Sequence, residues 1–382
     1  MTQLLYALQV EESTDVEEIA YALEKLLYVP DECLKPDIIT QLCNYYEMKF
    51  TDPKYKIKAF IVYGGGEPVG YVSAQIHPTY TSYSRKCGTF GWLLTEEFEV
   101  CKELIHSCEL FIRENRIRKI RGNINFPKHL GGIGFQITGF DAPMMCGIAF
   151  NHPQTKIRQY LEVLGYKNNA EYSCVHVTDF SWEQGRRELD ENIKIAYLSI
   201  EEMLERKREI LDIIRGSFRV LLPDSSGGDT GFNEIIDTYR EVPDEFYKLP
   251  KNFNPHEYSP RKEYREAWDS CDLEHVVTWA PFAIDRTTDK VVGVIFSIPN
   301  LYQLWSGVQL THTNVDTAVV DKNYARMGIF SNLNNIGQIT LSFNGIDYVE
   351  GTTIWSNNEK AVSAIFPHSS PLRKHVVYQK RI

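Results

Sequence analysis

Residues 319–333 combine side chains and spacing that suit the binding of a phosphorylated ligand. An apolar run leads through a short polar segment to Gly328, and a pattern with helical spacing follows at once. A strand that turns at a glycine directly into a helix points several backbone N–H groups and the positive end of the helix dipole at one place. This geometry suits a pyrophosphate group. The residues predicted to form the site are Val319, Val320, Ala325, Arg326, Met327, Gly328, Ile329 and Phe330.

Several other chemical patterns do not occur in the sequence. The ten histidines show no His-x-x-x-His spacing and the eight cysteines form no Cys-x-x-Cys pair, so no metal site is predicted. Residues 131–134 (Gly-Gly-Ile-Gly) lack the Lys-Ser/Thr that follows in a nucleotide-binding P-loop. Cys146 and Cys174 lie in apolar stretches, and we expect them to be packing residues.

A basic cluster occupies residues 113–121, where five of nine side chains are cationic. The favoured interpretation is a solvated helix end whose charges complement the helix dipole. A docking surface for an acidic ligand is the alternative. The cluster consists of Arg113, Arg116, Arg118, Lys119 and Arg121.

These segments need strands and helices to position them, and both halves of the chain supply the same order of elements. Apolar periodicity and turn residues predict strands, helices and one hairpin in each half. In the first half we expect helices over 16–27, 98–112 and 160–164, a hairpin over 59–63 and 68–76, and strands over 117–124 and 171–177. In the second half we expect helices over 200–214, 329–343 and 358–366, a hairpin over 278–284 and 291–298, and strands over 313–320, 348–355 and 375–381.

The two hairpins share a Val-Gly pair in the second strand, Val69-Gly70 and Val292-Gly293, which indicates an internal duplication. A polar hinge after residue 178 divides the chain into predicted domains over 1–180 and 190–382. Residues 223–230 are predicted to be a flexible loop, and residues 243–260 a long connection. The expected fold class is α/β with a mixed sheet in each of two tandem domains.

Composition narrows the classes of function. The net charge of −10 argues against a nucleic-acid-binding protein that relies on a basic surface. The longest stretch without Asp, Glu, Lys or Arg, residues 291–315, is too polar for a membrane helix. No secretory signal is recognisable, so we expect a cytoplasmic protein. The sequence does not indicate an oligomeric state.

The loop at Gly328 resembles the cofactor loop of the GNAT superfamily, the acyl-CoA-dependent N-acyltransferases. In that family a strand is followed by Tyr-Arg-Gly-x-Gly-Ile and a helix. Residues 289–295, 350–358 and 374–380 are similar to the hairpin, fifth strand and closing strand of the family. Segments of the first half, including residues 88–92, 120–125 and 139–143, are similar to a poorly characterised GNAT-like subgroup. The resemblance covers roughly residues 50–180 and 275–382.

The resemblance implies that the loop binds the pyrophosphate of acetyl-CoA or another acyl-CoA, with Asn358 at the place of the Asn that follows the fifth strand. Asp316 and Glu350, on or beside the strands that flank the loop, become candidate general bases. The tyrosine that commonly protonates the leaving thiolate is replaced here by Ile365. Tyr324 and Tyr378 are therefore the substitute candidates for the acid.

Two further departures weaken the match: Ala325 stands where the family usually has Arg or Gln, and Phe330 where it usually has Gly or Ala. The first half contains no Gly-x-Gly loop at the corresponding position. We therefore expect the second domain to bind the acyl-CoA and the first to be degenerate in its loop.

The leading hypothesis is an acyltransferase that moves an acyl group, most simply acetyl, from acyl-CoA to an amine on a small molecule or peptide. One alternative is a non-catalytic GNAT-fold protein that binds a ligand or a partner. A third is a tandem transferase that uses a larger acyl or aminoacyl donor.

Overall fold

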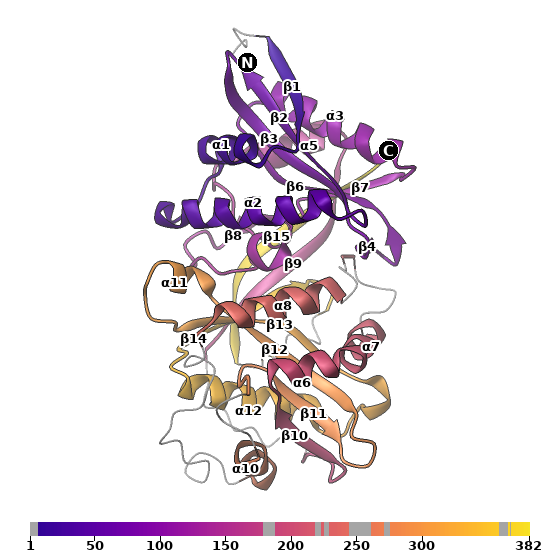
Figure 1. The fold of residues 1–382 in the computed structure, drawn as a ribbon, viewed down its shortest axis with the longest axis vertical. Helices are drawn as coiled ribbons and strands as arrows, with labels where there is room; N and C mark the ends of the chain where they lie inside the picture. Colours follow the sequence, from indigo (N-terminus) through magenta and orange to yellow (C-terminus); the bar gives the residue numbers. More distant parts are fainter. Residues whose placement is uncertain are drawn as a thin grey trace. The chain divides into compact units, whose positions relative to one another are not determined.

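The computed structural model describes residues 7–178, 188–217, 223–224, 229–243, 261–270, 276–358, 366 and 368–382. The chain forms two compact units (Figure 1). Unit 1 contains Met1–Tyr172, Leu222–Ser226 and Arg373–Ile382, and unit 2 contains Ser173–Leu221 and Gly227–Leu372. Among the described residues, no helix is both long and apolar enough to cross a membrane.

Unit 1 is built around a mixed sheet. Strands β1, β2, β3 and β6 pair antiparallel in that order, β6 and β7 pair parallel, and β15 pairs antiparallel with β7 and β8. The strands are β1 Leu8–Ser13, β2 Lys56–Gly64, β3 Glu67–Ile76, β6 Gly88–Thr95, β7 Lys119–Gly122, β8 Phe135–Thr138, β9 Lys167–Val177 and β15 Ser369–Arg381, with a small separate hairpin of β4 Thr81–Ser82 and β5 Arg85–Lys86. Both β9 and β15 cross the boundary between the units.

Helices cover both faces of the unit 1 sheet. Helix α3 packs on β2, β3 and β6, while α1 and α2 pack on each other and on β2 and β3. Alternation along β3 separates the two layers, since Val72 and Ala74 lie in the core cluster with α3 whereas Gln75 is hydrogen-bonded to Tyr45 of α2. The helices are α1 Val16–Leu26, α2 Lys35–Thr51, α3 Phe98–Glu114, α4 Lys128–Gly131 and α5 Ile157–Val163, with a 3-10 turn over Glu32–Leu34.

Unit 2 repeats this plan. Strands β10, β11, β12 and β13 pair antiparallel in that order, and β13 pairs parallel with β14. The strands are β10 Ile193–Tyr197, β11 Pro281–Asp285, β12 Val291–Pro299, β13 His312–Val320 and β14 Tyr348–Trp355. The helices are α6 Ile200–Glu205, α7 Lys207–Ser217, α8 Asp229–Glu241, α10 Lys262–Asp269, α11 Leu301–Trp305 and α12 Ile329–Phe343. Helix α12 contacts β11, β12 and β13, and α7 and α8 contact β12.

The repeated Val-Gly pair has the same packing role in both units. A Cβ atom at Gly70 would lie 2.3 Å from Cγ1 of Val100 in α3, and one at Gly293 would lie 3.0 Å from Cγ2 of Ile329 in α12. Glycine therefore lets α3, which follows β6, approach the sheet of unit 1 closely, and it lets α12, which follows β13, do the same in unit 2. Shared packing and shared strand order together confirm the predicted duplication.

Most predicted elements are present, and α12 and β14 have the predicted bounds. The predicted helix over 200–214 is interrupted at Arg206, so that α6 and α7 are separate, although the capping box of Ser199 and Glu202 is formed. Strands β1 and β10 and helices α2, α8 and α10 were not predicted. Residues 359–365 of the predicted helix over 358–366, and residues 244–260 of the predicted connection, lie outside the described residues.

The division into units differs from two contiguous domains over 1–180 and 190–382. Residues 373–382 belong to unit 1 because β15 pairs there with β7 and β8. Residues 222–226 also belong to unit 1. Asp224, within the segment predicted to be a flexible loop, is buried, and Asp229 already begins α8.

Candidate active site

The amino end of α12 is the centre of the predicted site. Gly328 is the N-cap residue, adopts a left-handed conformation with φ of 74°, and makes no side-chain capping bond. Its carbonyl oxygen accepts bonds from the Asn332 backbone N–H at 3.2 Å and from the Ser331 hydroxyl at 3.1 Å. The first N–H groups of a helix have no acceptor within the helix. At this helix start they are available to a ligand anion together with the helix dipole.

Several bonds fasten the loop that precedes α12. The Asp321 N–H donates to the Val292 carbonyl at 2.8 Å, and the Asp190 N–H donates to the Met327 carbonyl at 3.1 Å. Tyr324, in a 3-10 turn over Lys322–Tyr324, donates its hydroxyl to Asp285 Oδ2 at 2.7 Å. This bond to a carboxylate raises the pKa of Tyr324, so the hydroxyl keeps its proton at neutral pH. The loop is thus held in place from the segment before β10, from β11 and from β12.

The predicted loop residues form one continuous run at this helix start. Val319 is buried at the end of β13, and Val320 is half-buried beside it. Ala325 and Arg326 are exposed, and Arg326 also has a positive φ of 72°. Met327 and Phe330 are half-buried, and Ile329 is buried against the sheet.

The parallel pairing of β13 and β14 stops at Val315, five residues before the end of β13. The register runs from His312 and Tyr348 to Val315 and Gly351, and β13 then continues to Val320 in register with β12. In open α/β sheets, ligands bind at the carboxyl ends of parallel strands where such pairing separates. The end of this pairing, like the amino end of α12, is therefore a position at which such sheets bind ligands.

Glu350 lies on β14 at the last part of this pairing. Glu350 is 0 % exposed, and its Oε2 accepts a hydrogen bond from the Tyr348 hydroxyl at 3.3 Å. Asn314 of β13 is its neighbour in the register and is buried too. A buried carboxylate beside a hydroxyl and an amide is a suitable acceptor for a proton from an amine.

The sequence analysis missed the aromatic stack that fixes Tyr348. The ring of Tyr348 is sandwiched between His176 at 4.6 Å and His312 at 4.7 Å, with interplanar angles of 20° and 22°. Burial lowers the pKa of His312, which favours its neutral form. The two imidazoles hold the ring whose hydroxyl reaches Glu350. No local pattern signalled this arrangement, because the three residues come from three strands.

Asp316 differs from Glu350 in exposure. It is the additional residue of a β-bulge, since Val315 is opposite Ser297 and Thr317 is opposite Phe296. The side chain is exposed and accepts a bond from the Thr317 hydroxyl at 2.8 Å. The pKa of Tyr239 on α8 is raised mainly by burial and secondarily by the negative charge of Asp316. Asp316 and Tyr239 therefore lie near each other.

Tyr378 belongs to unit 1, whereas the other predicted residues belong to unit 2. It lies on β15 within unit 1, is 3 % exposed, and donates its hydroxyl to Glu162 Oε1 at 2.8 Å. Burial, followed by this bond, raises its pKa to about 12. Asn358 is at the end of the described segment after β14, where its N–H donates to the Trp355 carbonyl at 2.8 Å.

The corresponding place in unit 1 has different chemistry. Helix α3 starts after Glu96 and the N-cap residue Glu97, and Glu99 lies in its first turn. Carboxylates at a helix start repel a phosphate. In β7, Arg121 is opposite Thr89, as Glu350 is opposite Asn314 in β14, and both residues precede a glycine. An arginine at this position cannot accept a proton.

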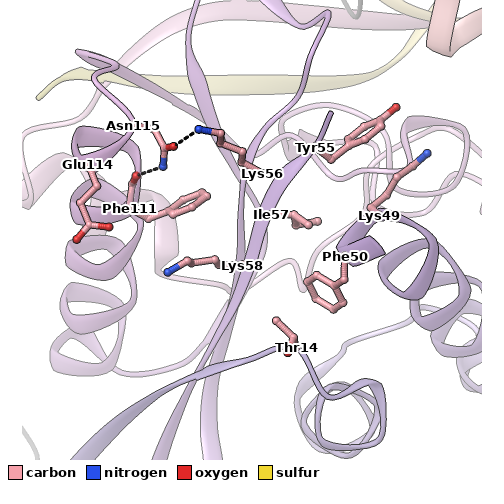
Figure 2. A pocket seen from close by; sticks show the side chains of 10 residues that line it. All are labelled: Thr14, Lys49, Phe50, Tyr55, Lys56, Ile57, Lys58, Phe111, Glu114 and Asn115. Atoms are coloured by element: carbon pink, nitrogen blue, oxygen red, sulfur yellow. Dashed lines mark hydrogen bonds between the residues drawn. The ribbon is translucent and has the colours of Figure 1, made fainter. Parts of the chain in front are cut away.

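A separate pocket of about 450 Å³ lies in unit 1 at the carboxyl end of α3 (Figure 2). It contains three lysines, but Lys56 Nζ donates to Asn115 at 2.7 Å, Lys58 Nζ is 2.6 Å from a carboxylate of Glu12, and Lys49 Nζ lies 4.3 Å from the ring centre of Tyr55. The ammonium groups therefore already have partners. Its lining residues are Thr14, Lys49, Phe50, Tyr55, Lys56, Ile57, Lys58, Phe111, Glu114 and Asn115.

No family model and no curated protein matches the chain by sequence. Among solved structures, it is similar to a tandem GNAT protein from the clavulanic acid biosynthesis pathway, determined without AcCoA. The TM-score is 0.54 at 11% identity, and the match covers 98% of both chains. A GCN5-related glucosamine N-acetyltransferase region of a fungal multi-domain GH3 beta-N-acetylglucosaminidase matches with a TM-score of 0.55 at 12% identity, over 98% of this chain and 38% of that one.

A third similar structure is a GCN5-related N-acetyltransferase from Anabaena variabilis, with a TM-score of 0.50 at 9% identity over 98% of this chain and 73% of that one. At such identities the likeness concerns the fold. The chain has the GNAT fold in tandem, as the resemblance in its sequence implied.

Proposed function

We propose that unit 2 is an acyl-CoA-dependent N-acyltransferase that moves an acyl group, most simply acetyl, to an amine. The observation that carries the proposal is the helix start at Gly328, uncapped by a side chain, in the same unit as the end of the β13 and β14 pairing and the buried Glu350. These features provide a phosphate-binding group and a proton acceptor in the same unit. Unit 1 has carboxylates and an arginine in the corresponding places.

The residues of unit 2 can perform the steps that acyl transfer requires. The α12 amides would bind the pyrophosphate, and the exposed Arg326 adds a positive charge to the same loop. Glu350 would take the proton of the amine, directly or through water, while the Tyr348 hydroxyl orients the carboxylate. Acyl-CoA supplies the thioester: the amine nitrogen forms the new bond to the acyl carbon, the C–S bond breaks, and the thiolate takes up a proton.

Of the two tyrosines predicted to give that proton, Tyr324 belongs to unit 2 and is protonated at neutral pH. It is our candidate for the acid. Holding amine and thioester in line is expected to supply much of the rate in any case, because correct orientation replaces an encounter in solution.

The experiment is to measure acetyl-CoA binding by calorimetry and then turnover against a panel of small-molecule and peptide amines. Mass spectrometry of the acylated product avoids interference from the free cysteines. Glu350→Gln should leave the Kd for acetyl-CoA unchanged and lower kcat by about 10²–10⁴-fold. Asp316→Asn serves as the matched control on the neighbouring strand, and we expect a change in kcat below about threefold because Asp316 is exposed.

A non-catalytic ligand-binding module is the second candidate, favoured by Phe330 and Ala325 in the loop. Binding of acetyl-CoA without turnover of any amine would support that function. Turnover with longer acyl or aminoacyl donors, but not with acetyl-CoA, would identify a different donor. Absence of binding at millimolar acetyl-CoA would contradict the proposal.

A further inference from the structure

A buried carboxylate in unit 1 is surrounded by hydrogen-bond donors. Asp224 Oδ1 accepts a bond from Arg121 Nε at 2.9 Å and one from the Tyr80 hydroxyl. Its Oδ2 accepts a bond from Arg121 Nη2 at 2.7 Å and one from the Tyr172 hydroxyl at 2.6 Å. The side chains of Arg121 and Asp224 are both 0 % exposed. Each carboxylate oxygen therefore has two donors, in the paired geometry with which arginine recognises carboxylates.

The donors are held by unit 1 independently of Asp224. The third guanidinium nitrogen, Arg121 Nη1, donates to Gln379 Oε1 at 2.7 Å and to Asn169 Oδ1. Tyr80 and Tyr172 are buried, and burial, followed by the charge of Asp224, raises the pKa of each well above its usual range. Their hydroxyls consequently remain donors at neutral pH. Since arginine is also permanently protonated, the group can bind an anion and cannot accept a proton.

The carboxylate reaches this group from a distant part of the chain. The donors lie on β7, on β9 and just after β3, whereas Asp224 is 103 residues from Arg121 and 52 from Tyr172. Within residues 218–228 the structure describes Pro223 and Asp224, and both are buried. Through its carboxylate, Asp224 makes four hydrogen bonds to side chains of unit 1 that are distant in the sequence.

Arg121 also occupies a significant position, because it is the counterpart of Glu350 in the repeated fold. We propose that unit 1 contains a carboxylate-binding site formed by Arg121, Tyr80 and Tyr172, and that Asp224 is the intramolecular ligand that fills it. The ligand class is a carboxylate carried by a peptide. The place that holds the proton acceptor in unit 2 is therefore a closed anion site in unit 1, not a second site for an amine.

The test is to remove the internal ligand and supply carboxylate from outside. Asp224→Ala should lower the melting temperature, and sodium formate or acetate should then restore it relative to sodium chloride at the same ionic strength. At about ten times the Kd, the expected rise is about 3–6 °C. The wild type should show no difference between the salts because its site is filled. Asp237→Ala, which removes an exposed aspartate of α8, is the matched control and should behave as the wild type.

A second arm distinguishes a free carboxylate from one on a peptide. A synthetic peptide of residues 219–229 should stabilise Asp224→Ala at lower concentration than acetate, and the same peptide carrying Asp224→Asn should not. If Asp224→Ala is unfolded in chloride, refolding is compared in formate and in chloride, and recovery of the circular dichroism signal in formate alone supports the site. Equal responses to chloride and carboxylate, or an equal carboxylate response of the wild type, would overturn the proposal.

Discussion

Gly328 offers the most direct test of how unit 2 would hold acyl-CoA. Its φ of 74° makes most L side chains costly there, by about 1–2 kcal/mol. Aspartate tolerates this conformation better than most residues, and as an N-cap it would accept bonds from the α12 amides, which returns about 1 kcal/mol. We therefore expect Gly328→Asp to change the free energy of unfolding by no more than about 1 kcal/mol.

The effect of the same substitution on binding should be much larger. A carboxylate about 4 Å from a phosphate charge is repelled by about 4 kcal/mol at an effective dielectric constant of 20, and salt reduces this value. The new side chain also occupies amides that the pyrophosphate needs, each worth about 1.5–3 kcal/mol to a charged acceptor. Together these effects predict a rise of at least roughly 100-fold in the Kd for CoA, since 1.4 kcal/mol is tenfold.

Calorimetric titration with CoA measures the change, and a thermal melt shows that the protein remains folded. Gly345→Asp is the matched control, because Gly345 follows the carboxyl end of the same helix with a φ of 80°, and a Cβ added there would lie 3.7 Å from Nε2 of Gln309. It should destabilise the protein but leave the Kd within about twofold. A folded Gly328→Asp protein that binds CoA as the wild type does would refute the assignment of the α12 amides to the pyrophosphate.

Three further perturbations separate stability from activity. Tyr378→Phe should reduce stability by about 0.5–1.5 kcal/mol and leave kcat unchanged, because its hydroxyl bonds Glu162 in unit 1; a large loss of kcat in a stable protein would contradict this. The buried His375 has a pKa lowered to about 4 from 6.5, so the unfolded chain takes up a proton first as the pH falls. Stability should fall by about 3 kcal/mol between pH 6.5 and 4, and His375→Gln should flatten this dependence in melts across that range. Gly70→Ala should destabilise by about 1–3 kcal/mol because its Cβ would overlap Val100, whereas Gly293→Ala should cost less; denaturant titrations would compare them.

The candidate site was predictable where its signal is local. Gly328 marks the start of α12 and Gly345 follows its end, both with positive φ, so the helix bounds are readable from the sequence. A strand was predicted over residues 348–355, and the resemblance to the family's fifth strand made Glu350 a candidate. The stack of Tyr348 between two histidines was not predictable, because strand order brings those rings together.

Long-range partners also explain the other differences. Arg121 lies in a run of basic residues, which favoured a solvated helix end, yet its side chain is fully buried. Asp224, which balances its charge, is 103 residues away in a segment predicted to be a loop. Periodicity likewise predicted a strand at 375–381 but carried no information on which unit it would join.

Because β15 is the last strand of the chain but pairs within unit 1, it determines the order in which the two units can be completed during synthesis on the ribosome. The last residue of the first continuous segment of unit 1 is Tyr172, and the strand that pairs with β7 resumes at Arg373. At about 5–20 residues per second, about 10–40 s separate the two. Throughout that interval one side of β7 has no strand from β15 to pair with, and an open strand edge invites association with other chains. The last residue of unit 2 is Leu372, whereas unit 1 still needs residues 373–382. All residues of unit 2 are therefore synthesised before the last residues of unit 1.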